Sequence, residues 1–92
     1  MKARRIRLMA DHWAFPLWAD DGMLSPGDLP LSAGLEARLE RWGDRYSAEL
    51  GPEFEWPSEE ARMAFIAEGR QLHALVSREL GDLYQIIYVD DY

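Results

Sequence analysis

Two histidines, His12 and His73, and the carboxylates near the first of them are the residues whose types could do acid–base or metal chemistry. Asp11 precedes His12, and the pair Asp20 and Asp21 follows a few residues later. Metal motifs place two ligands at a short fixed spacing on one element, as in His-Glu-x-x-His, and this chain has no such pair. We therefore expect no metal and no cofactor. A ligand-binding or catalytic cleft around His12 and His73 is kept as the alternative function.

The other residue types that carry chemistry show no catalytic pattern. The chain contains no cysteine, which excludes disulfides, thiolate metal sites and a cysteine nucleophile. No serine lies in a nucleophile elbow, and the seven glycines are too scattered to form a phosphate-binding loop. The Asp20-Asp21-Gly22 segment lacks the further acidic ligands of a calcium loop, so it is interpreted as a turn. The absence of these patterns favours a protein that is not an enzyme, and the histidine cleft is the one feature that would support catalysis.

An aromatic cluster beside a loop rich in aspartate is the strongest candidate for a binding site. Tryptophan dominates the energetics of protein interfaces, and Trp18 is the preferred anchor. Core filling is the alternative explanation, because aromatic residues bury the most area in a small domain. The candidate partner-binding residues are Trp13, Phe15, Trp18, Asp20, Asp21 and Asp28.

Charge indicates the kind of partner. The formal net charge is −7, and four of the ten basic residues precede position 10, whereas all 17 acidic residues follow it. Such a surface repels phosphate backbones, so we expect no nucleic acid. The same charge would attract a basic protein partner, although keeping the protein soluble is the more common reason for an acidic surface. No apolar run approaches the roughly 20 residues that span a bilayer, and the charged start of the chain does not resemble an export signal. We expect a cytoplasmic protein that does not bind membranes.

The alternation of apolar and polar residues, together with helix-capping residues, predicts the order strand, long loop, helix, helix, strand within a single domain of residues 1–92. Two helices are indicated by apolar stripes between serine N-caps and glycine C-caps. The two strands are indicated by alternating or β-branched residues. The expected elements are a strand at 5–10, an irregular aromatic segment at 11–18, a loop at 19–30, helices from Ser32 to Gly51 and from Ser58 to Gly81, and a strand at 84–89 covered on both or nearly both faces.

This order predicts an α/β protein of the α+β type, with an αα-hairpin over a small antiparallel sheet built from the two terminal strands. Antiparallel pairing would place Arg4 and Arg5 beside Asp90 and Asp91. Two strands make a marginal sheet. We therefore expect either a further strand, from the segment around Trp13 or from residues 54–56, or edge-to-edge pairing of two copies, and we favour the homodimer.

Gly69 interrupts the apolar stripe of the second predicted helix. Glycine in a helix costs about 1 kcal/mol relative to alanine unless another element packs closely against it. We expect a bulky side chain such as Trp42 to fill this notch.

Several segments resemble an uncharacterised family of small bacterial proteins. The resemblance lies in the segments 6–11, 16–18, 29–32, 68–72 and 80–81 and in the stripe of Leu39, Trp42 and Tyr46. It implies a bacterial cytoplasmic setting and a compact α/β fold, without an established activity. The family tends to have tyrosine where this chain has His12, which weakens a catalytic role for that residue. The resulting hypothesis is a noncatalytic interaction module, of the kind represented by immunity and inhibitor proteins, that presents acidic and aromatic side chains to a basic partner.

Overall fold

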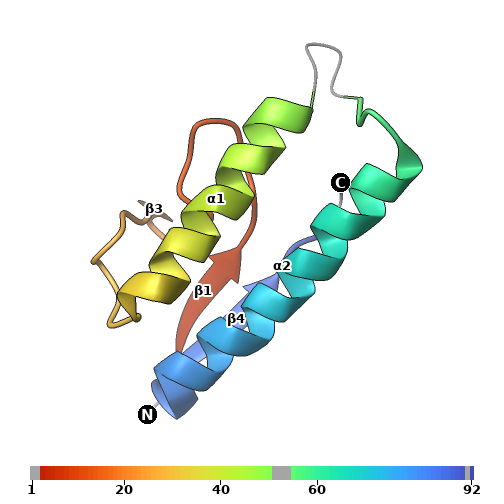
Figure 1. The fold of residues 1–92 in the computed structure, drawn as a ribbon. Coiled ribbons are helices and arrows are strands. Elements are labelled where there is room, and N and C mark those ends of the chain that lie inside the picture. The colour runs from red at the N-terminus through yellow and green to blue at the C-terminus, as the bar shows by residue number, and fades with distance from the viewer. Residues whose placement is uncertain (1–2, 51–54, 91) are drawn as a thin grey trace.

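Two helices pack on one face of a mixed four-stranded sheet in the computed structural model, which describes residues 3–50, 55–90 and 92 (Figure 1). The strands lie in the order β3-β2-β1-β4 across the sheet. The elements are β1 (Arg4–Leu8), β2 (Leu17–Ala19), β3 (Gly22–Met23), α1 (Ala33–Glu49), α2 (Glu59–Leu80), the 3₁₀ turn η1 (Gly81–Leu83) and β4 (Tyr84–Tyr88). The predicted α+β class and the β-α-α-β order of the main elements are confirmed.

The helix ends follow the predicted capping residues. The Ser32 hydroxyl accepts a hydrogen bond from the Leu35 N–H at 3.3 Å, and the Ser58 hydroxyl accepts one from the Ala61 N–H at 3.0 Å. Gly81 caps the end of α2 with a φ of 70°, a conformation that favours glycine. The described C-cap of α1 is Leu50, and the predicted stop signal Gly51-Pro52 lies outside the described residues.

The terminal strands pair in parallel, so the predicted antiparallel pairing is wrong. Arg5 is the register partner of Gln85, and every other pair from position 4 to position 8 follows the same parallel register. The helix α2 ends where β1 begins, so the chain enters β4 running in the direction of β1 (Figure 1). Asp90 forms an ion pair with Arg70 instead, and Asp91 lies outside the described residues. Exposed ion pairs contribute about 1 kcal/mol or less, too little to reverse a strand that α2 positions.

The sheet is extended within the chain by two short strands. β2 pairs antiparallel with β1 and with β3, so part of the segment expected to be irregular and part of the expected loop are strand. The turn between β2 and β3 is formed by Asp20 and Asp21, as predicted from the Asp-Asp-Gly sequence. Residues 55 and 56 are not in a strand, and Phe54 lies outside the described residues. Since the sheet has four strands in one chain, its completion no longer requires a second copy, and the homodimer stays a prediction.

The core lies between the helices and one face of the sheet. Ile6 and Leu8 point inward from β1, while Arg5 and Arg7 point outward, as their alternation predicted. The core residues of the two helices are chiefly Leu35, Leu39, Trp42, Phe65, Leu72 and Val76. None of the helices in the described part of the chain is long and apolar enough to cross a membrane.

Gly69 forms the predicted notch in α2. A Cβ atom at this position would lie 2.8 Å from Cζ2 of Trp42 and would also clash with the Tyr88 hydroxyl. The absence of a side chain therefore lets α1 and β4 both approach α2 closely.

We expect Gly69→Ala to destabilise the protein by about 1–3 kcal/mol, because the methyl group overpacks the contact with Trp42 and Tyr88. Gly34→Ala is the matched control, since a Cβ at Gly34 would meet no atom within 4 Å. Urea unfolding of both variants measures the difference. Equal stability of Gly69→Ala and Gly34→Ala would contradict close packing at this notch.

Tyr88 makes the stability sensitive to alkaline pH. Burial raises the pKa of its phenol from 10.0 to about 12, with Asp90 adding to the rise and Arg70 opposing it. The hydroxyl donates a hydrogen bond to the Ile66 carbonyl at 3.2 Å. The folded state holds the Tyr88 proton more tightly than the unfolded chain does. The protonated phenol therefore stabilises the folded state fully below about pH 10, and this stabilisation is lost as the pH rises through about 12.

Absorbance of tyrosinate during an alkaline titration should therefore show one phenol that ionises later than a free tyrosine. We expect Tyr88→Phe to remove this late transition and to flatten the decline of stability between pH 10 and 12. A late transition that persists in Tyr88→Phe would assign it to another phenol.

Candidate partner-binding surface

The segment that joins β1 to β2 is a closed loop held against α1. The Met9 N–H donates to the Pro16 carbonyl at 3.0 Å, which closes the base of the loop. Gly43 provides the contact on α1, because a Cβ there would lie only 3.3 Å from the Ala14 carbonyl oxygen and 3.4 Å from Pro16 Cδ. The loop is therefore positioned by a rigid helix rather than projecting freely.

Trp13 lies at the tip of this loop with its side chain in solvent. It is 87% exposed. Its φ of 59° places it in the left-handed region, where a bulky residue is strained. The Trp13 N–H donates to the Ser47 hydroxyl of α1 at 3.1 Å, and the ring of neighbouring His12 packs on Tyr46 with 4.9 Å between centroids. The loop thus holds a large apolar side chain outward in a conformation that other contacts must maintain.

A hollow of about 230 Å³ lies beside Trp13, and two carboxylates of α1 border it. Glu40 and Asp44 are one helical turn apart and exposed. Neither carboxylate has an ion-pair partner among the residues that the structure describes. We call this the Trp13 surface; its residues are Trp13, Ala14, Phe15, Pro26, Glu40 and Asp44.

The six residues predicted from the sequence lie in four places. Trp13 and Phe15 share the hollow, although Phe15 is half-buried and packs against the core. Trp18 lies on β2, half-buried, with its indole N–H donating to the Met9 carbonyl at 2.9 Å.

The predicted aspartates are not gathered around Trp13. Asp20 forms an exposed ion pair with Arg5 at 3.4 Å, and Asp21 is exposed beside it in the β2–β3 turn. The Asp28 carboxylate accepts a hydrogen bond from the Ser25 N–H at 2.8 Å, within the loop before α1. The carboxylates next to the exposed tryptophan are instead those of α1.

Glu40 and Asp44 were missed by reasoning from the sequence. Their spacing of four residues puts them on one side of α1, next to the apolar stripe. This spacing was visible in the sequence. The sequence did not show that the loop after β1 lies against the same side of the helix and brings Trp13 there.

The described contacts of the two histidines are with different elements. His73 is half-buried and its Nε2 lies 2.8 Å from the Ile86 carbonyl oxygen, so it is the structural histidine that its place on the apolar stripe predicted. His12 packs on Tyr46 of α1 instead. Neither imidazole lines any of the four hollows bordered by Arg38, Leu75, Ala3 and Trp13, respectively. Within residues 3–50, 55–90 and 92, no cluster of three or more acidic or histidine side chains could hold a metal ion.

A second hollow, of about 470 Å³, lies along the solvent side of the α1–α2 contact. Arg38, Arg41 and Arg45 line it from α1, and Arg45 makes ion pairs of 3.5 Å with Glu49 and with Glu68 of α2. Asp44 also borders this hollow, together with Ala48 and Glu68, so the arginine-lined groove adjoins the Trp13 surface.

The sequence was also compared with models of known protein families. The family model described as Serratia CdiI immunity protein-like matches residues 4–91, which includes every helix and strand of the fold. No curated protein matches the chain.

Proposed function

Because the chain belongs to the Serratia CdiI immunity protein-like family, we propose that it is an immunity protein that binds a toxin through the Trp13 surface. The family supports a role in protein interaction of the immunity or inhibitor type. The finer proposal concerns the contact itself. Trp13 enters a pocket of the toxin, and the carboxylates of Glu40 and Asp44 pair with basic groups around that pocket.

The exposure of Trp13 is the observation that carries this proposal. A side chain of this size that is 87% exposed contributes nothing to the core, and a left-handed backbone at a residue other than glycine costs about 1–3 kcal/mol. Strain of this kind is concentrated at functional sites. Tryptophan is also enriched among the few residues that supply most of the energy of an interface.

Preorganisation adds to the case. The hydrogen bond to Ser47, the closed base of the loop and the contact at Gly43 hold the loop on α1. A partner that binds a loop already in its bound conformation avoids the entropic cost of ordering it.

Charge supports a basic toxin. The chain has a net charge of −7, and neither Glu40 nor Asp44 forms an ion pair in the described structure, although Asp44 shares the second hollow with Arg41 and Arg45. Unpaired rim charges of this kind steer an oppositely charged partner and raise the association rate. We further propose that the protein acts in the cytoplasm, in keeping with a chain that lacks cysteine.

Trp13→Ala should weaken binding of the cognate toxin domain by about 30-fold or more, which corresponds to roughly 2 kcal/mol for a central interface residue. Isothermal titration calorimetry measures the change. Leu83→Ala is the matched control, because Leu83 is 68% exposed and lies in η1. Equal loss of affinity in both variants, or no loss in Trp13→Ala, would contradict the proposed contact.

A charge-reversal pair tests the carboxylates separately. Asp44→Lys and Asp82→Lys change the net charge equally, and both aspartates are exposed, but Asp82 lies in η1. We expect Asp44→Lys to slow association with the toxin domain about tenfold at low salt, with a smaller effect at high salt. Stopped-flow rates that fall equally for both variants would indicate that only the overall charge matters.

A further inference from the structure

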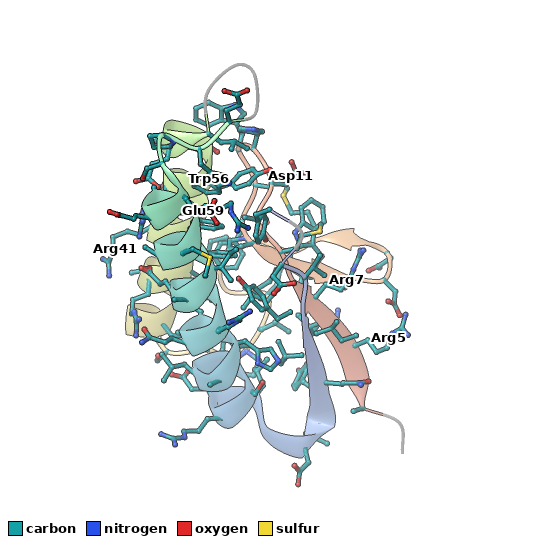
Figure 2. The ribbon with its side chains drawn as sticks, turned by 90° about the vertical axis from the view of Figure 1, so that its right-hand side faces the viewer. Arg5, Arg7, Asp11, Arg41, Trp56 and Glu59 are labelled. Carbon is teal, nitrogen blue, oxygen red and sulfur yellow. The ribbon has the colours of Figure 1, made fainter. Side chains whose placement is uncertain are left out.

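The face of the sheet opposite the helices carries a continuous row of side chains. Register partners Met23 and Trp18, then Trp18 and Arg7, then Arg7 and Ile87 form this row across all four strands. Cross-strand partners project to the same side of a sheet. We call this the outer face. Arg5 lies beside the row, and Figure 2 shows Arg5 and Arg7 pointing away from the helices.

The outer face is more apolar than a solvent face requires. Parallel strand pairs are usually covered on both faces, whereas the helices cover only one face of the β1–β4 pair (Figure 2). Ile87 faces outward from β4, and Met23 is 52% exposed. The hydrogen bond from Trp18 to Met9 fixes the indole, so this apolar surface is already ordered.

Two arginines of β1 belong to this face, Arg7 within the row and Arg5 beside it. Arg7 has no ion-pair partner among the described residues, and the pair between Arg5 and Asp20 is exposed, with side-chain exposures of 61% and 70%. A hollow of about 510 Å³ at the start of β1 is lined by Ala3, Arg4, Arg5, Asp20 and Gln85. In a chain with a net charge of −7, this face therefore presents one arginine, Arg7, that has no ion-pair partner in the described structure.

We propose that the outer face is a second docking surface, which binds an acidic protein segment that carries aliphatic side chains next to its carboxylates. The guanidinium groups of Arg5 and Arg7 suit carboxylates because arginine can donate two parallel hydrogen bonds to one. Aliphatic side chains of the segment pack on Trp18, Met23 and Ile87. This surface is separate from the Trp13 surface, so the proposal does not depend on toxin binding there.

A second copy of the chain fits this face less well. The area of the outer face is roughly 240 Å², from a width of three strand spacings of about 4.8 Å and a length of five residues at about 3.3 Å each. A stable interface buries about 800 Å² on each partner. A two-fold dimer through this face would also bring its arginines toward those of the other copy. A short acidic segment requires less area and complements the charge.

The test is an NMR titration with two synthetic peptides that share two central leucines, which are flanked by aspartates in one peptide and by lysines in the other. Of the four tryptophan indole signals, that of Trp18 is assigned with Trp18→Phe. We expect the aspartate peptide to shift the Trp18 indole N–H and the Ile87 amide in a saturable way. The lysine peptide should leave both signals unchanged.

Arg7→Gln and Arg41→Gln form the matched pair of variants, because each removes one exposed arginine and Arg41 points away from the sheet (Figure 2). We expect Arg7→Gln to weaken the aspartate peptide about tenfold, as for loss of a charged hydrogen bond. Arg41→Gln and Trp13→Ala should have no effect.

Four results would overturn the proposal. The first is equal response to both peptides, and the second is a response confined to the Arg38–Arg41 side of α1. The third is a shift of the Trp18 indole with protein concentration alone, which would identify a second copy as the occupant. The fourth is tighter binding of a single-stranded oligonucleotide than of the aspartate peptide at this face. Since toxin affinity is measured separately with Trp13→Ala, either proposal can fail while the other stands.

Discussion

The stacking of Trp42 on Phe65 is the contact on which the arrangement of the other elements depends. The rings of these two residues, one from each helix, lie 4.4 Å apart with an angle of 8° between their planes. The Trp42 indole N–H also donates to the Phe65 carbonyl at 2.9 Å, so a buried polar atom is satisfied and the two helices are fixed in rotation relative to each other. Gly69, one turn further along α2, accommodates the edge of the indole and the Tyr88 hydroxyl. The same indole therefore joins α1, α2 and β4.

This buried tryptophan determines what the protein presents to a partner. With the rotation of α1 fixed, Gly43 and Ser47 face the loop that follows β1, and Glu40 and Asp44 border the same hollow as Trp13. Both helices lie on one face of the sheet, which leaves the opposite face with its arginines uncovered (Figure 2). The position of Glu40 and Asp44 beside Trp13 and the exposure of the arginines on the sheet thus follow from one packing arrangement.

Local signals predicted the elements better than their directions. The caps at Ser32, Ser58 and Gly81 were recognisable because each acts within one helical turn. The parallel direction of β4 was not recognisable from the sequence, because it depends on where α2 ends relative to β1. The strands β2 and β3 have three and two residues, too few for a period to be visible. For the candidate site, Trp13 was identifiable from its residue type, but its exposure depends on a left-handed backbone and on a hydrogen bond to Ser47, 34 residues away.

Photocrosslinking tests the toxin contact most directly, because it reports proximity rather than a change in affinity. A photoreactive benzoylphenylalanine at position 13 should form a covalent adduct with the cognate toxin domain on irradiation. The same group at position 18, on the outer face, or at position 83, in η1, should form none. Adducts from position 18 or 83, with none from position 13, would place the toxin on another side of the molecule and contradict the proposed role of the Trp13 surface.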